Sequence, residues 1–196
     1  MTKTLKFTFL FNISEKVHIF RFNNLSIIFI KITLFVIMIS VLFVCLGNIC
    51  RSPLAEALFM QHVNKQLLND RFKADSAGTA SYHLGELPDI RTRNTALRIS
   101  NLKLTHKARQ INSQDFLLFD YIVAMDKTNF QNIMKLRPDN ARAEVVLMRH
   151  FDSMIQNEDT IPDPYYGTEI DFEEVHYMLL DCTQTFLKKL SAKNNN

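Results

Sequence analysis

The sequence has 196 residues, enough for one ordinary domain with a hydrophobic core of its own. Hydrophobic residues make up 47% of it and charged residues 22%, which excludes a disordered or fibrous chain, and three cysteines exclude a disulfide framework. The net charge of +3 comes from the N-terminus, because residues 1–37 carry a net charge of +4 and residues 38–196 carry −1. The larger part of the chain therefore lacks the basic footprint of a nucleic-acid-binding protein, and we expect no nucleic-acid partner.

Residues 1–37 differ in composition from the rest of the chain. They contain no Gly, Ala, Pro or Asp, and Phe, Ile, Lys and Asn, which A/T-only codons favour, supply 21 of the 37 positions. We therefore expect an extension translated from upstream sequence, ahead of a start at Met38. A membrane element is the alternative, because residues 25–39 are almost wholly apolar, but Lys31 interrupts the run and no small-residue cleavage site follows. We expect one domain over residues 38–196, in the cytoplasm and without a membrane partner.

Beyond Met38, segments typical of strands and of helices alternate along the chain. Short apolar runs predict buried strands over residues 41–44, 72–77, 121–125 and 144–148. Apolar spacing and composition predict helices over residues 53–67, 91–99, 127–136 and 172–190. This alternation predicts an α/β fold of three layers, in which helices flank both faces of a four-stranded parallel sheet. Ligands bind beyond the carboxyl ends of the strands in such a sheet.

The loop after the first predicted strand has the composition of an anion-binding site. Gly47 and Asn48 tolerate the unusual dihedrals with which a loop points successive N–H groups at one oxyanion. The helix expected to begin near Ser52 adds the positive end of its dipole. A thiol at Cys45 would lie among these donors, which favours its thiolate, and Arg51 can bind two phosphate oxygens through its planar fork. Together these residues describe a phosphate cradle with a nucleophile at its base.

Taken singly, the same residues have simpler explanations. A Cys and an Arg at this spacing occur often by chance, and a buried Cys at the end of a strand is usually an inert core residue. The preceding strand, the following helix, and the Gly-Asn and Arg-Ser-Pro pairs in register favour the phosphate-binding interpretation. The Gly-Lys-Ser/Thr of nucleotide-binding loops is missing, so we do not expect ATP as the ligand.

Residues 41–53, Val-Leu-Phe-Val-Cys-Leu-Gly-Asn-Ile-Cys-Arg-Ser-Pro, resemble the signature of the low-molecular-weight protein tyrosine phosphatases. The likeness covers about residues 40–190 and includes residues 75–79, 106–110, 119–126 and 163–167. The resemblance implies a four-stranded parallel sheet, in agreement with the pattern above. It also implies an enzyme that hydrolyses phosphotyrosine and aryl phosphates through a cysteinyl-phosphate intermediate, acts on a tyrosine-phosphorylated protein, and uses no cofactor or metal.

The same resemblance assigns the catalytic roles. Cys45 is expected to be the nucleophile, Arg51 to bind the phosphate and stabilise the transition state, and Asp163 to be the general acid. An acid is needed because phenolate is a poor leaving group, and the Asp163-Pro pair taken alone is also a common turn element. The residues expected to bind phosphate or substrate are Leu46, Gly47, Asn48, Ile49, Cys50, Ser52, Tyr82, Tyr165 and Tyr166.

Supporting residues follow from the same match. In the family, residues corresponding to Ser76 and His106 hydrogen-bond around the Asn48 and Ser52 side chains and hold the loop in shape. Without its motif, His106 would be taken for an ordinary surface or core histidine. Tyr82 stands where family members often have Trp, so the rim of the cleft departs from the family's pattern.

The other two cysteines have different expected roles. Cys50 lies inside the loop and could form a reversible disulfide with Cys45, as its family counterpart does, or simply pack beneath the loop; both alternatives stay open. Cys182 falls on the apolar stripe of the last predicted helix, which favours a place in the core.

Three other functions fit the sequence less well. Thioredoxin-linked arsenate reductases share this fold, but they need two further cysteines after the second strand, and residues 78–120 contain none. Protein-arginine phosphatases typically have Thr where this sequence has Ile49, and a smaller pattern than Tyr165-Tyr166. A binding module without catalysis would be expected to lack the nucleophile, the Arg or the acid. The sequence therefore favours a tyrosine phosphatase.

Overall fold

The computed structural model describes residues 16–20, 28–32, 38–154 and 160–193, and the chain divides into two units, Met1–Ile37 and Met38–Asn196. In the first unit, β1 (Lys16–Phe20) pairs antiparallel with β2 (Ile28–Ile32). The sequence analysis did not predict this pair of strands. Among the described residues, none of the helices combines the length and the apolar character needed to cross a membrane.

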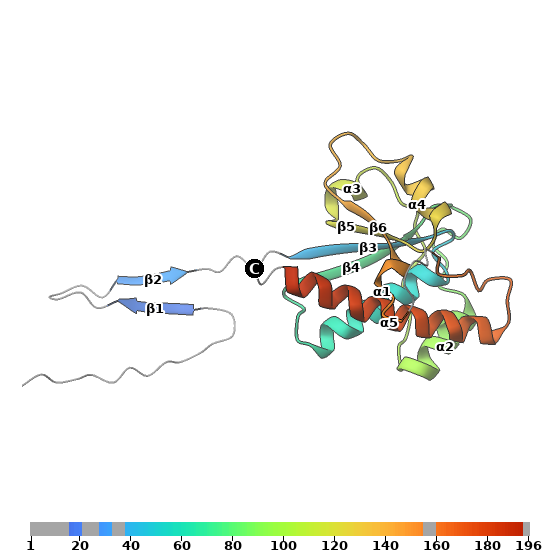
Figure 1. Ribbon diagram of the computed structural model, residues 1–196, viewed down its shortest axis with the longest axis horizontal. Coiled ribbons are helices and arrows are strands. Elements are labelled where there is room, and N and C mark those ends of the chain that lie inside the picture. The colour runs from blue at the N-terminus through green and yellow to red at the C-terminus, as the bar shows by residue number, and fades with distance from the viewer. Residues whose placement is uncertain (1–15, 21–27, 33–37, 155–159, 194–196) are drawn as a thin grey trace, which may run out of the picture. The chain divides into compact units, whose positions relative to one another are not determined.

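The second unit is built on a four-stranded sheet (Figure 1). Its strands are β3 (Ile39–Cys45), β4 (Phe72–Gly78), β5 (Tyr121–Ala124) and β6 (Glu144–Leu147). All neighbours are parallel and the order is β4-β3-β5-β6, which confirms the predicted sheet. Because the strands are parallel, the carboxyl ends of the two central strands β3 and β5 open on the same edge.

Helices cover both faces of the sheet (Figure 1). On one side lie α1 (Arg51–Lys65), α2 (Ile90–Ser100) and α5 (Glu169–Lys193), and on the other lie α3 (Asp115–Leu118) and α4 (Lys127–Met134). Alternate residues of β3 enter two separate cores: Val41 and Phe43 pack with α1 and α5, whereas Leu42 and Val44 pack with α3 and α4. Burial on both faces explains the unbroken apolar run of this strand.

One helix and one strand end differently from the prediction in a way that changes where a residue lies. The helix expected over residues 53–67 begins at Arg51 and ends at Lys65, and Leu67, which was placed on its apolar stripe, is 84% exposed with φ 57°. The chain reverses there, because the Leu68 N–H donates to the Val63 carbonyl and so places Leu68 against the core. Met148 begins a short 3₁₀ helix rather than ending the fourth strand.

The other predicted helices are present. The expected helix over residues 127–136 ends at Met134, and the last helix extends to Glu169–Lys193. Cys182 is fully buried in the core, as its place on the apolar stripe predicted. The short helix α3 was not predicted, since four residues are too few to show a helical period.

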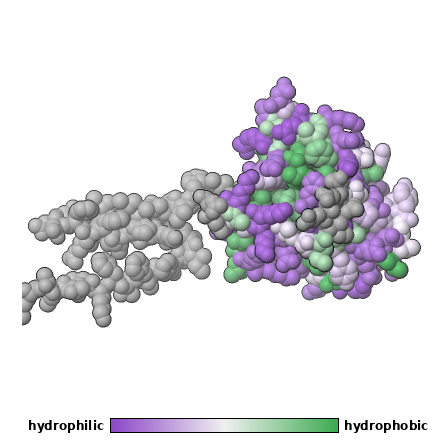
Figure 2. Space-filling view, in the orientation of Figure 1, coloured by the Kyte–Doolittle hydropathy of each residue, from purple (hydrophilic) through white to green (hydrophobic). Residues whose placement is uncertain are grey.

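On the face shown in Figure 2, apolar residues of the second unit lie among polar ones.

The N-terminal unit is predicted to be dispensable for folding of residues 38–196. Residues 38–196 form a compact unit of their own, with a hydrophobic cluster on each face of its sheet. A chain that begins at Met38 should therefore unfold within a few degrees of the full chain, as measured by circular dichroism. A large loss of stability on truncation would contradict this expectation. A separate measurement, mass spectrometry of the native N-terminus, would show whether peptides from residues 1–37 occur in the protein.

Candidate active site

The loop from Cys45 to Arg51 turns its carbonyl groups towards neighbouring segments. The carbonyls of Cys45 and Leu46 accept hydrogen bonds from the N–H groups of Thr79 and Ala80, each at 2.9 Å. In the part of the chain that the structure describes, no backbone acceptor takes the N–H groups of residues 47–50. These donors, with the N-terminus of α1, form the kind of concavity that binds an oxyanion.

Two positions in and beside the loop require a special backbone. Asn48 has φ 57°, in the left-handed region that few side chains adopt. Gly78, at the end of β4, lies so close to the loop that a Cβ there would be 2.7 Å from the Leu46 carbonyl oxygen. The loop therefore needs both a restraint on Asn48 and a glycine on the neighbouring strand.

Cys45 lies at the base of the loop with its sulfur beside a hydroxyl group. Its Sγ is 3.0 Å from the Ser52 Oγ, and only 3% of Cys45 is exposed. Ser52 Oγ accepts a hydrogen bond from the Asn48 Nδ2 at 2.9 Å, so the hydroxyl hydrogen stays available. It can donate either to the Ala77 carbonyl at 3.2 Å or to the sulfur. Ser52 is thus arranged to stabilise negative charge on the Cys45 sulfur.

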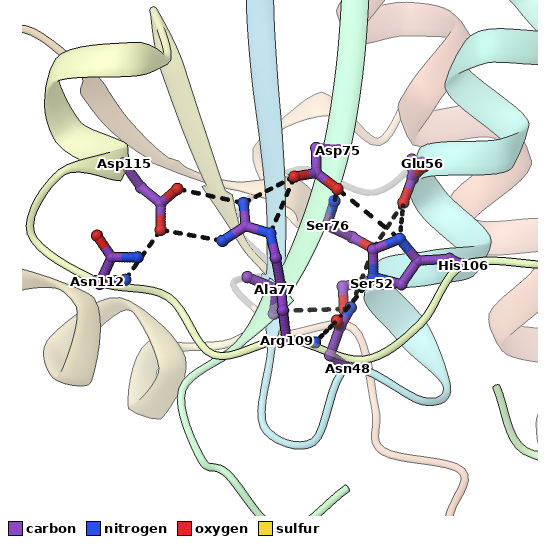
Figure 3. Close-up of polar contacts among 10 residues, drawn as sticks. All are labelled: Asn48, Ser52, Glu56, Asp75, Ser76, Ala77, His106, Arg109, Asn112 and Asp115. Atoms are coloured by element: carbon purple, nitrogen blue, oxygen red, sulfur yellow. Dashed lines mark hydrogen bonds and ion pairs between the residues drawn. The ribbon is translucent and has the colours of Figure 1, made fainter. Parts of the chain in front are cut away.

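The Asn48 side chain uses all four of its hydrogen-bonding positions (Figure 3). Its Nδ2 donates to the Oγ atoms of Ser52 and Ser76 at 2.9 and 3.0 Å. Its Oδ1 faces the His106 Nε2 at 2.9 Å and accepts the Arg109 N–H at 2.9 Å. Because an amide oxygen can only accept, Nε2 of His106 must carry the hydrogen. These four contacts hold the left-handed residue that shapes the loop.

A partly buried acid lies behind His106 (Figure 3). The Glu56 Oε2 accepts a hydrogen bond from the Ser76 Oγ at 2.7 Å and lies 3.3 Å from the His106 Nδ1. Burial raises the pKa of Glu56 to about 7 and lowers the pKa of His106. Both directions favour a neutral His106 and a proton held by Glu56. Glu56 was not among the predicted residues, although its position four residues after Ser52 places it on the same face of α1.

Arg109 connects this cluster to the far side of the sheet (Figure 3). Its Nε donates to the Asp75 carboxylate at 2.9 Å, and its two terminal nitrogens donate to the Asp115 carboxylate at 3.2 Å each. Glu56, Asp75 and His106 have ligand atoms within 4.8 Å of one another, a spacing compatible with a metal ion. Here Glu56 accepts a hydrogen bond from Ser76, Asp75 accepts one from Arg109, and His106 bonds Asn48 through Nε2, so the three side chains serve to hold the loop.

Glu56 should make stability depend on pH. Its raised pKa means that its contribution to stability is complete below its ordinary pKa of about 4.3 and is lost as the pH rises through about 7. Glu56→Gln removes this titration while it keeps an oxygen that can accept from Ser76. We expect the free energy of unfolding to fall by about 1–3 kcal/mol more in the parent than in the variant between pH 5 and pH 8.

Urea unfolding of the parent and of Glu56→Gln at the two pH values measures this difference. The burial that lowers the pKa of His106 is present in both proteins. An equal change with pH in the two proteins would show that Glu56 ionises normally.

Arg51 is held by groups on two other segments. Its Nη1 donates to the Asp126 carboxylate at 2.8 Å and to the Ile161 carbonyl at 3.0 Å, and its Nη2 donates to the Asp163 carboxylate at 2.5 Å. Its Nε is buried and has no hydrogen-bond partner among the described residues. The guanidinium thus has one anchored end, and an edge formed by Nε and Nη2 that can receive two oxygens of an anion.

Asp126 is a residue that sequence reasoning missed. It lies two residues after the end of β5 and caps α4, because its carboxylate accepts the Asn129 N–H at 2.6 Å. The signal was available, since an acid at the carboxyl end of a strand next to β3 must lie near the loop that follows β3.

A single pocket brings together most of the predicted residues. Its lining consists of Cys45, Leu46, Gly47, Ile49, Cys50, Arg51, Tyr82, His83, Asp163, Tyr165 and Tyr166. The Asn48 and Ser52 side chains lie beneath the loop, and Ser76 and His106 support them from β4 and from the segment after α2. His83 is a lining residue that was not predicted. Its ring lies close to Gly47, since a Cβ added to Gly47 would be 3.0 Å from the His83 ring.

Tyrosine side chains form the outer wall of the pocket. The rings of Tyr165 and Tyr166 are perpendicular, with centres 5.0 Å apart, and Tyr165 also lies 6.2 Å from the His83 ring. Tyr166 and Tyr82 are 97% and 75% exposed. An aromatic group that enters the pocket would therefore meet aromatic faces at the rim.

Cys50 lies behind the loop rather than at its centre. It is 5% exposed and packs with Ile49, Ala108 and Phe172. Burial raises the pKa of its thiol to about 12, which keeps it protonated. Cys45 and Cys50 are both free thiols in the structure, and a reversible disulfide between them stays a prediction.

Comparisons with known proteins agree on one family. A protein-family model described as low molecular weight phosphotyrosine protein phosphatase matches residues 40–196. Proteins of that name from Mus musculus and Schizosaccharomyces pombe are 43% and 44% identical to this chain, over 76% and 78% of it and 94% and 97% of their own length. The crystal structure of a protein tyrosine phosphatase from Entamoeba histolytica has a TM-score of 0.75 and 36% identity, and covers 80% of this chain and 99% of that one.

Proposed function

The chain belongs to the low molecular weight phosphotyrosine protein phosphatase family, and we propose the roles that its residues have in the hydrolysis of the substrate. The protein is a protein tyrosine phosphatase, a hydrolase of phosphate monoesters. One observation supports the assignment of roles to residues: Cys45, Arg51 and Asp163 line the same pocket, and the Nη2 of Arg51 donates to the Asp163 carboxylate there.

Phosphate binding is proposed to use the loop amides and the Nε–Nη2 edge of Arg51. Two phosphate oxygens accept hydrogen bonds from Nε and Nη2, while Nη1 stays on Asp126 and the Ile161 carbonyl. Because Asp163 occupies Nη2 in the structure, the phosphate must displace its carboxyl group. The displaced group then lies over the anion, on the side where the ester oxygen leaves.

The reaction proceeds in two steps. The Cys45 thiolate attacks phosphorus, the phosphorus–oxygen bond of the ester breaks, and Asp163 gives its proton to the departing phenolate oxygen. Water then attacks the cysteinyl phosphate, and the Asp163 carboxylate takes a proton from that water. The Cys45 sulfur leaves with the electron pair of the sulfur–phosphorus bond, and the nearby Ser52 hydroxyl stabilises the thiolate.

The substrate is proposed to be a tyrosine-phosphorylated protein. Tyr165, Tyr166 and Tyr82 surround the entrance with aromatic rings, which suit the ring of phosphotyrosine. We place the protein in the cytoplasm, because a nucleophilic thiol must stay reduced and reducing compartments maintain free thiols.

A side-by-side assay tests this function. Peptides that carry phosphotyrosine, phosphoserine or phosphoarginine in the same sequence are offered to the parent and to Cys45→Ser. We expect the parent to release phosphate fastest from phosphotyrosine. Faster hydrolysis of phosphoarginine would favour the protein-arginine phosphatase alternative, and release of phosphate by Cys45→Ser would remove this residue from its role.

A further inference from the structure

The Arg91 side chain joins three parts of the molecule just outside the pocket. Its Nε and Nη2 donate to the Asp89 carboxylate at 3.0 and 2.8 Å. Nη2 also donates to the Tyr165 carbonyl at 3.0 Å, and Nη1 to the Gly167 carbonyl at 3.4 Å. The guanidinium carbon lies 4.4 Å from the centre of the Phe172 ring, in the first turn of α5, and 5.6 Å from the centre of the Tyr165 ring. Such stacking holds a guanidinium in one orientation.

Asp89 connects Arg91 to the phosphate-binding loop. Its N–H donates to the Ile49 carbonyl at 2.8 Å, which is one of the outward carbonyls of that loop. Its carboxylate also caps α2 by accepting the Arg91 N–H at 2.8 Å, and only 12% of its side chain is exposed. A continuous set of bonds thus runs from the loop through Asp89 and Arg91 to the backbone of residues 165 and 167.

The turn over residues 163–167, called the acid turn here, carries Asp163. The Asp163 Oδ1 accepts the Tyr165 N–H at 3.3 Å, and the Gly167 N–H donates to the Pro164 carbonyl at 2.9 Å. The Asp163 side chain is 40% exposed, so packing alone does not fix it. Its position over the pocket therefore depends on where the backbone of the acid turn is held.

We propose that Arg91 is a positioning residue for Asp163. By holding the Tyr165 and Gly167 carbonyls of the acid turn to Asp89, it sets the distance between the proton donor and the anion bound in the loop. Arg91 itself touches neither substrate nor the reacting atoms. This inference rests on the general-acid role proposed for Asp163.

Leaving-group dependence tests the proposal. Loss of a correctly placed acid slows esters of basic phenols and spares esters of acidic ones. We expect Arg91→Gln to lower kcat/KM about tenfold or more for phenyl phosphate and less than about threefold for 4-nitrophenyl phosphate. The inhibition constant of inorganic phosphate should stay nearly unchanged. Arg91→Lys, which keeps the charge but not the fork, should show a smaller loss with the same dependence on the leaving group.

Arg98→Gln is the matched control. Arg98 lies on the same helix α2 and its Nη2 donates to the Glu173 carboxylate at 2.5 Å, so it also joins α2 to α5. It has no bond to the acid turn among the contacts of the described residues. Loss of this ion pair should leave kcat/KM for both esters within about twofold of the parent, because an exposed ion pair contributes little.

The double variant separates the two proposals. If Arg91 acts through Asp163, Arg91→Gln should cause no further loss with phenyl phosphate when Asp163 is already Asn. Equal losses for the two esters, or a further loss in the Asp163→Asn background, would overturn the role of Arg91 and indicate a general structural effect, which thermal unfolding would register. If Asp163→Asn alone slows both esters equally, the general-acid assignment fails first, and the role of Arg91 falls with it.

Discussion

Cys45→Ser is expected to show no measurable hydrolysis of aryl phosphates and to bind inorganic phosphate nearly as tightly as the parent. A serine hydroxyl in this place has no base to remove its proton, and it is a far weaker nucleophile than a thiolate. The amides of residues 47–50 and the Arg51 guanidinium are unchanged by the substitution, so the anion site persists. Stopped assays with phenyl phosphate and calorimetric titration with phosphate measure the two properties.

A second cysteine provides the control for this experiment. Cys182 is fully buried on α5 and lies in the core instead of the pocket. Cys182→Ala should lower stability by the loss of buried sulfur and keep turnover of the folded enzyme. Appreciable turnover by Cys45→Ser, or loss of phosphate binding together with turnover, would contradict the assignment of Cys45 as a nucleophile at the base of an intact anion site.

Asp163→Asn is expected to lower kcat/KM for phenyl phosphate by about 10²–10⁴-fold. An amide cannot give a proton to phenolate, whose conjugate acid has a pKa of about 10. The loss should be much smaller for esters whose leaving group is a weak base, because these need little protonation. Measuring kcat/KM across a series of substituted phenyl phosphates gives the dependence directly, and equal losses across the series would exclude Asp163 as the acid.

The pH profile offers a second measure of the same variant. The reaction uses Cys45 as a thiolate and Asp163 as a carboxylic acid, so kcat/KM should fall on both sides of an optimum pH. Asp163→Asn should lose the limb that falls with rising pH, since no acid remains to ionise. Asp70→Asn, which changes an exposed acid in the turn after α1, should keep both limbs. A basic limb that persists in Asp163→Asn would have to come from another group.

Local sequence was sufficient for the strand, loop and helix that carry the nucleophile. Cys45 and Arg51 are six positions apart, a buried apolar run before them indicates a strand, and Pro53 after them indicates the start of a helix. The parallel sheet could also be predicted, because strands that alternate with helices leave few other topologies. The long last helix and its core residue Cys182 could be predicted because apolar residues recur there every three or four positions.

Periodicity failed where the signal was short or ended in a turn. Leu67 has the spacing of a helical core residue, but the chain leaves α1 two residues earlier and turns Leu67 to solvent. Helix α3 has only four residues, and its Asp115 is buried because it binds Arg109, a contact that no local pattern reveals. The ends of elements depend on such turns and contacts more than on propensity.

Only the tertiary structure decided which distant groups meet Arg51 and Asn48. Asp126 and Asp163 lie 75 and 112 residues from Arg51, and they converge on it because β5 and the acid turn reach the same edge of the sheet as β3. His106 likewise reaches Asn48 from 58 residues away. The sequence determined the chemistry of the loop, since that chemistry lies in neighbouring residues. The partners that hold the loop and supply its acid were set by strand order and register, which depend on packing across the whole domain.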